Sequence, residues 1–396
     1  EHPLDVGRVR GSSPLSRTTI NMRILAIETS CDETAVALLE ISGPLEKPDI
    51  KVLGNTLMSQ VALHEKYGGV YPNLAKREHI KNLPVLLEKT LEEAGTNIQY
   101  PISNEIDFIA VTAGPGLEPA LWAGITFAEE LGKRWKKPVM PVNHMEGHIY
   151  SVLYKTESNS KSQILNPKST LELPAVALLV SGGHTELVFI RDFGKYEIIG
   201  RTLDDAVGEA FDKVGRLLGL PYPGGPKISR LAEKSRARIN YEKLPRSFSF
   251  PRPMINSGNL NFSYSGLKTA VLYKLRSEKR EDEEFKEDMA RAFEDAAVAV
   301  LVEKTRRALL NLGNEIKTLI VAGGVAANTH LINKLNNLIQ DFPGVVLRLP
   351  EKLLATDNAV MIGIAGFIDV KVNPDILKNR SKIKAMGNLN LTSSNR

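Results

Sequence analysis

The sequence predicts an α/β protein that is built from two lobes with the same plan. An apolar strand, a polar turn and a second apolar strand follow one another in residues 24–41, and the pattern returns in residues 175–190. Helical apolar spacing follows each of these hairpins. A repeated hairpin-then-helix plan indicates a duplicated α/β domain. The 396 residues are enough for two lobes with their own cores.

In the first lobe, strands are expected at short apolar runs and helices where apolar residues recur at helical spacing. The hairpin tip is polar and carries Asp32 and Glu33. Pro84 lies inside the first helical stretch, so we expect that helix to begin or to break there. In chain order, the elements are a hairpin over residues 24–41, a helix over 73–94, a strand over 106–113 and a helix over 117–135.

In the second lobe, the hairpin tip is the Gly-rich stretch 181–185. A long helix later in the lobe keeps Met289, Phe293 and Val300 on one face. The last helix could pack back on the first lobe. In chain order, the elements are strands over residues 175–180, 187–190 and 196–202, helices over 206–218 and 288–312, a strand over 319–322 and a helix over 355–367.

Composition limits the possible classes of function. No uninterrupted apolar run is long enough to span a bilayer, so no membrane partner is expected. A net charge of +5 permits a nucleic-acid partner without requiring one. The single cysteine, Cys31, excludes an internal disulfide and fits a reducing compartment.

The two chain ends differ in composition from the lobes. Residues 1–21 are rich in Arg, Ser and Thr without an apolar stretch, which is typical of the remnant of an organellar transit peptide. The acidic Glu1 and Asp5 count against that interpretation, and a disordered start is the alternative. The expected segments are residues 1–21, a first lobe over 22–172 with a polar surface insertion at 156–170, a second lobe over 173–370, and a basic tail over 371–396 that is solvated or contacts phosphate backbone.

His144 and His148 form the most informative single motif. If the chain is helical from Asn143 onward, both imidazoles lie on one face, where they could share a metal ion. Asp357 starts a predicted helix in the other half, and as a third ligand it would bridge the two lobes. Chance spacing of the histidines and capping of a helix by Asp357 are the alternatives. Met145 stands where the zinc-protease signature needs glutamate, which disfavours a peptidase of that type.

Three Gly-rich turns could approach phosphates. Residues 181–185 offer backbone N–H groups, residues 322–326 lead from a strand into a helix, and residues 222–226 form a third tight turn. Neither the Walker nor the Rossmann spacing is present, and each turn alone could be an ordinary one. Three such turns, each beside a strand or helix end, favour a nucleotide cleft.

Two side chains near these turns could contact a ligand. Asn328 follows the second turn and could reach a ribose or a base. Asp212 lies on a predicted helix, where it could receive a ligand hydroxyl or pair with Lys213 or Arg216.

The stretch 246–252 alternates aromatic residues with cations, and Phe262, Tyr264, Lys268 and Lys274 continue the pattern. Such aromatic rings could stack on RNA bases while the cations hold phosphates. Alternating Phe in a strand-like segment can equally belong to the core.

Taken together, ten motifs between Met22 and about Phe367 match one protein family. They are residues 27–34, 67–72, 114–117, 144–148, 179–185, 208–213, 222–226, 265–270, 322–328 and 356–358. The sequence resembles the universal tRNA threonylcarbamoyladenosine synthase family, called TsaD in bacteria and formerly labelled O-sialoglycoprotein endopeptidase. The resemblance implies a duplicated actin-like ATPase (ASKHA) fold with two lobes around a central nucleotide cleft.

The resemblance also implies site residues. His144, His148 and Asp357 would bind one divalent metal ion (Zn, Fe or Mg), and Asp32 and Glu33 match family residues needed for activity. An ATP- or AMP-type nucleotide, as substrate or product, would be held by residues on both sides of the cleft. These are Leu179, Val180, Ser181, Gly182, Gly183, Asp212, Gly225 and Asn328.

At two positions the sequence resembles the bacterial members of the family more than the archaeal and eukaryotic cytosolic members. Leu179 occupies the place of a Tyr that can add a metal ligand in archaeal and eukaryotic cytosolic members, so solvent or substrate would take the fourth metal position. Ser229 stands where those members tend to carry an acid. A bacterial-type sequence with a transit-like start predicts the mitochondrial matrix.

The implied reaction transfers the threonylcarbamoyl group from threonylcarbamoyl-AMP to N6 of the adenosine next to the anticodon of ANN-decoding tRNAs, and releases AMP. The implied partners are tRNA, a separate enzyme that forms the adenylate, and a second copy of the chain in a homodimer. Two other classes remain open at this point: a metallopeptidase, and a non-catalytic ATP-dependent switch of the actin-like fold.

Overall fold

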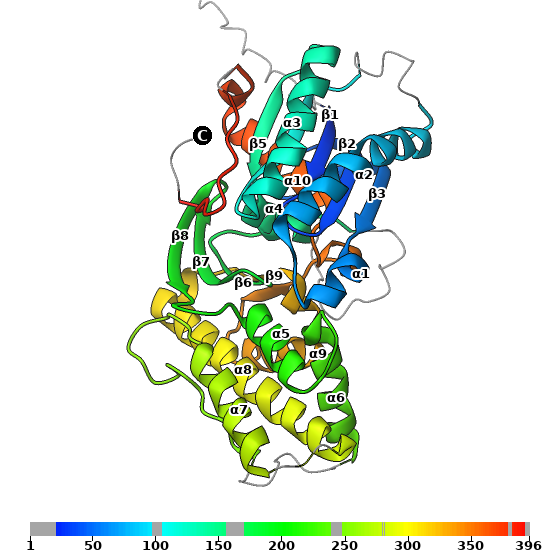
Figure 1. Ribbon diagram of the computed structural model, residues 1–396. Coiled ribbons are helices and arrows are strands. Elements are labelled where there is room, and N and C mark those ends of the chain that lie inside the picture. Colours follow the sequence, from blue (N-terminus) through cyan, green and yellow to red (C-terminus); the bar gives the residue numbers. More distant parts are fainter. Residues whose placement is uncertain are drawn as a thin grey trace, which may run out of the picture.

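The computed structural model describes residues 21–96, 105–155, 170–238, 248–278, 280, 282–378 and 382–392. Figure 1 shows an upper lobe that contains β1–β5 and a lower lobe that contains α5–α9. The transit-like segment 1–20 and the insertion at 156–169 lie outside the described residues. The predictions for those two segments therefore stay predictions.

The first sheet has the strand order β3-β2-β1-β4-β5. Strand β1 pairs antiparallel with β2, with Ala26 opposite Ala37, and parallel with β4, with Ala26 beside Ala110. The strands are β1 (Met22–Glu28), β2 (Glu33–Ser42), β3 (Asp49–Ser59), β4 (Phe108–Gly114) and β5 (Val139–Asn143).

The second sheet repeats this plan, with the order β8-β7-β6-β9-β10. Its central strand β6 again pairs antiparallel with the next strand in the chain and parallel with a strand that follows later. The duplicated α/β fold expected from the two hairpins is therefore confirmed. The strands are β6 (Ala175–Val180), β7 (Thr185–Asp192), β8 (Lys195–Arg201), β9 (Thr318–Ala322) and β10 (Val346–Arg348).

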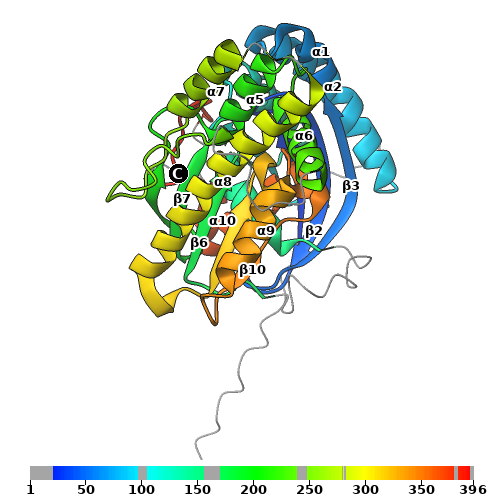
Figure 2. The ribbon, with the colours of Figure 1, turned by 90° about the horizontal axis from the view of Figure 1, so that it is seen from below.

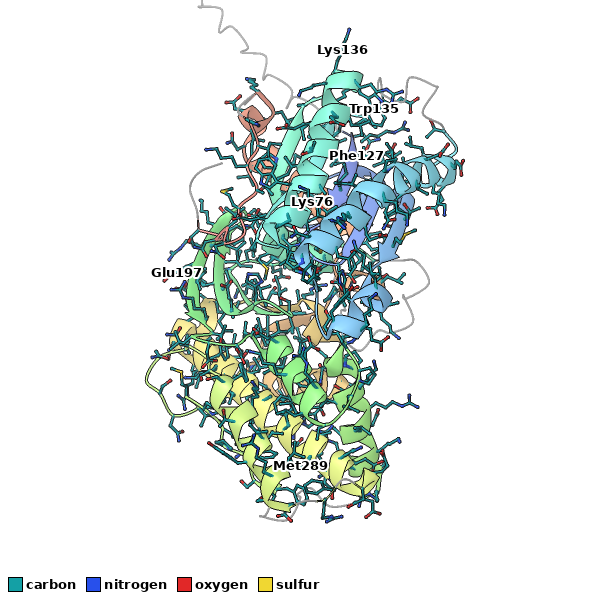
Figure 3. All side chains as sticks on the ribbon, viewed as in Figure 1. Lys76, Phe127, Trp135, Lys136, Glu197 and Met289 are labelled. Atoms are coloured by element: carbon teal, nitrogen blue, oxygen red, sulfur yellow. The ribbon has the colours of Figure 1, made fainter. Side chains whose placement is uncertain are left out.

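The helices form three layers around the two sheets. They are α1 (Val61–His64), α2 (Pro72–Glu93), α3 (Glu118–Trp135), α4 (His144–Tyr150), α5 (Val207–Leu217), α6 (Gly224–Arg238), α7 (Ser265–Glu278), α8 (Glu283–Leu312), α9 (Thr329–Ile339) and α10 (Ala359–Val372). Helices α2 and α3 cover the outer face of the first sheet, and α5–α9 pack on the outer face of the second (Figures 1 and 2). Figure 3 shows Trp135 on α3 in the first lobe and Met289 on α8 in the second.

The third helical layer, α4 with α10, lies between the sheets. Both faces of the central strands are buried: Leu25 belongs to the outer cluster with α2 and α3, whereas Ala26 belongs to the inner cluster. That inner cluster also holds Ala177 of β6 and Phe367 of α10. Helix α10 contacts β1 and β2, and α4 contacts β6 and β9. The last helix thus packs on the first sheet, although its chain position follows the second.

Several elements were not expected from the sequence, and one expectation was wrong. Strands β3, β5 and β10 and helices α1, α6 and α7 were not predicted, although the buried Ile228, Leu231 and Ala232 of α6 do recur at helical spacing. Helix α2 neither begins nor breaks at Pro84 but runs through it. Leu83 and Leu86 are buried on either side of the exposed Pro84. Their packing against the sheet and α3 holds both halves of the helix together despite the missing N–H.

The C-terminal segment is not simply a solvated tail. Residues 382–392 return to the first lobe, where the Met386 amide donates to the Ala113 carbonyl (2.9 Å) and the Gly116 amide donates to the Gly387 carbonyl (3.2 Å). Ile383 and Leu391 are buried. This segment therefore closes over the turn that follows β4. Among the described residues, we find no helix with the length and hydropathy to cross a membrane.

Candidate functional site

A cleft of about 1210 Å³ separates the lobes, and both hairpin tips line it. Asp32 and Glu33 come from the tip between β1 and β2, and the stretch 181–183 comes from the tip between β6 and β7. The internal repeat therefore places two equivalent turns on opposite walls of one cavity.

The two histidines of the predicted metal site lie on helix α4 and face the same carboxylate. Asn143 caps this helix by accepting a hydrogen bond from the Met145 amide (2.9 Å). His144 Nε2 is 3.3 Å and His148 Nε2 is 3.2 Å from Asp357 Oδ1. One ligand atom from each of the three side chains lies within 4.8 Å of the others. The structure thus brings the three predicted ligands together.

Asp357 does not have the local setting expected from the sequence. Helix α10 begins two residues later, and Asn358 caps it by accepting from the Met361 amide (2.9 Å). Capping is therefore not the role of Asp357. Because α4 and α10 pack together in the central layer, Asp357 meets the histidines within that layer and does not bridge two otherwise separate domains.

The chemistry of these three residues fits a divalent metal ion. His148 is fully buried, yet neither of its ring nitrogens makes a well-formed hydrogen bond. A buried nitrogen without a partner is costly unless something else binds it. Burial lowers the pKa of His148, which favours the neutral, metal-binding form. Two imidazoles and one carboxylate suit Zn or Fe better than Mg, which prefers oxygen ligands.

The pKa values of His144 and Asp357 are shifted in opposite directions because each side chain faces groups of opposite charge. Burial lowers the pKa of His144, but the carboxylates of Asp357 and Glu28 outweigh burial, so its pKa is raised. Burial likewise raises the pKa of Asp357, but the two histidines outweigh this effect and hold its pKa well below the usual range. Asp357 is thus ionised and able to ligate a cation at neutral pH.

Asp32 and Glu33 form an acidic pair on the wall of the cleft. Burial and the neighbouring Asp32 raise the pKa of Glu33 to about 10, so at neutral pH this side chain is an uncharged acid. Glu33 Oε1 accepts a hydrogen bond from the Ser59 hydroxyl (3.2 Å). Glu33 can therefore donate a hydrogen bond, and Asp32 lies beside it on the wall of the cleft.

Hydrogen bonds between Ser181 and His184 close the Gly-rich tip of the second hairpin. The Ser181 amide donates to the His184 carbonyl (2.9 Å), and the His184 amide donates to the Ser181 hydroxyl (3.1 Å). A Cβ at Gly182 or Gly183 would meet no atom within 4 Å, so the backbone is open to a ligand there. The predicted binding residues Leu179 and Val180 behave differently: both are buried in β6 and do not line the cleft.

Asp212 lies on α5 and Gly225 lies at the start of α6, and both line the cleft from the second lobe. Asp212 Oδ1 accepts a hydrogen bond from the Gly224 amide (2.7 Å). Lys213 forms an ion pair with Asp205 (2.6 Å). Burial raises the pKa of Asp212, and the positive charge of Arg216, whose guanidinium donates to the Gly68 carbonyl of the other lobe, opposes this larger effect. Asp212 thus shapes the Gly-rich turn and lines the cleft.

Asn328 is fixed by its neighbours on both sides. Its Oδ1 accepts from the Leu331 amide (2.8 Å), which caps α9. Its Nδ2 donates to Glu294 Oε1 (2.7 Å) and to the hydroxyl of Ser229 (2.9 Å). Both Nδ2 hydrogens are already used, so a ligand acceptor would have to displace one of these bonds, whereas Oδ1 keeps a second lone pair for a ligand hydroxyl or amine.

The expected aromatic surface for RNA belongs largely to the core. Phe250, Phe262 and Tyr264 are buried. The ring of Phe248 packs against Phe285, with its centroid 5.9 Å away. These rings are not free to stack on bases, so the alternative interpretation of this stretch as core is correct. Arg246 lies outside the described residues.

Sequence reasoning missed several residues of the cleft. Ser30 and His184 line it from the two hairpin tips, and both lie in motifs that had been singled out without a role for them. Gly387 and Asn388 line it from the C-terminal segment, for which the sequence contains no signal.

Comparison with known proteins identifies close relatives. A family model described as "TsaD: tRNA N6-adenosine threonylcarbamoyltransferase" matches residues 51–364. A protein of that name from Thermosipho melanesiensis is 43% identical over 370 residues, which cover 93% of this chain and 100% of the relative. One from Thermotoga neapolitana is 45% identical over 88% of this chain and 95% of the relative. One from Aromatoleum aromaticum is 44% identical over 87% and 90%.

Among solved structures, the chain is similar to HypF. HypF from T. kodakarensis superposes with a TM-score of 0.53 over 91% of this chain at 13% identity. A full-length HypF in the phosphate- and nucleotide-bound form gives a TM-score of 0.50 at 12% identity. This chain spans about half the length of each HypF chain (49% and 47%). At this identity the likeness concerns the fold alone, which is the two-lobed actin-like fold expected from the sequence.

Proposed function

Because the chain belongs to the TsaD family of tRNA N6-adenosine threonylcarbamoyltransferases, we propose that it transfers a threonylcarbamoyl group to N6 of an adenosine in tRNA. The observation that carries this proposal is the cluster of His144, His148 and Asp357, which reaches the wall of a cleft lined by two phosphate-type turns. The donor we propose is threonylcarbamoyl-AMP, made by a separate adenylate-forming enzyme. The acceptor is the adenosine next to the anticodon of ANN-decoding tRNAs, and AMP leaves.

In this proposal the cleft holds the adenylate between its two walls. The adenosine would lie beside Gly225 and Asn328, and the phosphate would lie at the backbone of residues 181–183, where no side chain intervenes. Preorganised backbone N–H groups of this kind favour the negative charge that develops when a carbonyl is attacked. Binding and orientation of both substrates would then account for much of the rate increase.

The acidic pair would handle the proton of the attacking amine. With its raised pKa, Glu33 keeps its proton and can donate a hydrogen bond. We propose that Asp32, beside it, orients the N6 amine and receives its proton as the new C–N bond forms. A divalent ion held by His144, His148 and Asp357 would supply Lewis-acid polarisation of the reacting carbonyl or phosphate.

We further propose a homodimer in the mitochondrial matrix. Several large apolar side chains are exposed on the edge strand β3, near or on α2 and on the short helical turn between them, which supports self-association in this region. They are Leu57, Met58, Tyr67, Tyr71, Ile80 and Val85. The matrix location rests on the composition of residues 1–21 alone.

The test is reconstitution with defined components. The purified protein is incubated with threonine, bicarbonate, ATP, the adenylate-forming enzyme and unmodified tRNA, and modified adenosine is measured by mass spectrometry after nuclease digestion. We expect His144→Ala and Asp357→Asn to abolish the product without unfolding the chain. The matched control is Asp192→Asn at the exposed end of β7, which should retain activity. No product from the metal-loaded wild-type protein would overturn the proposal, and hydrolysis of peptides without tRNA would favour a metallopeptidase.

A further inference from the structure

Glu28 is a fully buried carboxylate directly behind the histidine pair. It is the last residue of β1, and its Oε2 lies 3.0 Å from His144 Nδ1. The same oxygen accepts a hydrogen bond from the Thr112 hydroxyl (2.6 Å), and Oε1 accepts one from the Ser30 amide (2.5 Å). Two hydrogen-bond donors of the first lobe, the Thr112 hydroxyl and the Ser30 amide, thus hold the carboxylate that faces the imidazole.

This arrangement determines which nitrogen of His144 carries the proton. An ionised carboxylate only accepts hydrogen bonds, so the nitrogen that faces it must donate. Nδ1 of His144 therefore carries hydrogen, and Nε2, 3.3 Å from Asp357 Oδ1, is the nitrogen left to bind a metal ion once the ion displaces its proton. The hydroxyl of Ser30 is also near Nδ1, but at a longer distance of 3.3 Å.

The second histidine has no comparable support. Nδ1 of His148 is buried and has no hydrogen-bond partner among the described residues, so only packing and the nearby Asp357 orient that ring. Its ring meets that of His144 edge to face, with centroids 4.7 Å apart. Orienting His144 therefore also limits where His148 can lie. A fully buried carboxylate is costly unless it is paired, and the support of a metal ligand would explain why Glu28 is retained at this position.

We propose that Glu28 is a positioning residue that holds His144 in the Nδ1–H tautomer, with Nε2 aimed at the metal position. This inference rests on the metal site of the proposed function. It predicts that metal affinity depends on a residue that does not contact the ion.

The first experiment compares Glu28→Gln with the wild type in a titration with Co²⁺, whose visible absorption reports the ligand geometry. A carboxamide has a single oxygen, so either His144 Nδ1–H or the Ser30 amide loses its acceptor. We expect affinity to fall by about 10- to 100-fold, with an altered spectrum. The matched control is Glu40→Gln on β2, where the acid pairs with Arg23, and its affinity should stay within about twofold of wild type.

The second experiment does not depend on the folding of Glu28→Gln. In ¹⁵N-histidine-labelled wild-type protein loaded with Zn²⁺, the His144 signals, assigned by comparison with His144→Gln, should show a protonated Nδ1 and a ligating Nε2. A protonated Nε2, or a folded Glu28→Gln protein with wild-type affinity and spectrum, would overturn the inference. A wild-type protein that binds neither ion would instead overturn the metal site of the proposed function.

Discussion

Gly323 allows a test of how tightly the ends of the two central strands of the second sheet approach each other. The residue follows β9 and has φ +96°, a conformation that side chains other than glycine rarely adopt. A Cβ at this position would lie 2.5 Å from the carbonyl oxygen and 2.8 Å from the carbonyl carbon of Val180. Val180 is held in β6 by its pairing with Thr185, so its backbone cannot move away easily.

The expected cost of Gly323→Ala follows from these two effects. The strained backbone costs about 1–3 kcal/mol, and the steric overlap costs a similar amount. We therefore expect the free energy of unfolding to fall by about 2 kcal/mol or more. Gly324 is the matched control, because its φ is not positive and its Cβ would meet no atom within 4 Å. Gly324→Ala should change stability by no more than about 0.5 kcal/mol.

The assay is urea unfolding followed by far-UV circular dichroism. Fluorescence would follow the wrong lobe, because Trp122 and Trp135 both lie on α3 of the first lobe. If Gly323→Ala matches Gly324→Ala within about 0.5 kcal/mol, the close approach of β6 and the turn after β9 does not constrain this position, and the reasoning is wrong.

Two further predictions concern pH and helix α2. Burial raises the pKa of Asp295, but hydrogen bonds from His330 and Arg236 outweigh it and lower the pKa to about 2. A lowered folded-state pKa stabilises the protein above pH 4, and this stabilisation is lost as the pH falls toward 2. Asp295→Asn should therefore lower the free energy of unfolding by about 1 kcal/mol at pH 7, a figure discounted for the partial exposure of the side chain, and by almost nothing at pH 2. Urea unfolding at both pH values measures the two differences. An equal loss at both pH values would contradict the ion-pair account. Pro84→Ala should raise the free energy of unfolding by about 1 kcal/mol or more in the same assay, because it restores a backbone N–H to the middle of α2. No gain would mean that the packing of α2 accommodates the proline ring without cost.

The parts of the site that the sequence predicted are those with a local signature. The i, i+4 spacing of His144 and His148 is a property of one helical turn, and the hairpin tips are visible as polar or Gly-rich breaks between apolar runs. Where the signal was local but ambiguous, the structure decided between the alternatives. Phe262 and Tyr264 are core residues, and Asp212 accepts from a backbone amide.

By itself, the sequence determined the duplicated plan and the residue types that meet in the cleft, because strand and helix periodicity depends only on near neighbours. Only the tertiary structure decided that Glu28 lies 3.0 Å from His144 Nδ1, that Asn358 and not Asp357 caps α10, and that the C-terminal segment joins the cleft wall. Those contacts exist because two sheets share the layer formed by α4 and α10, which brings together segments far apart in the chain. Such packing depends on the shapes of both lobes at once, and no local pattern of residues encodes it.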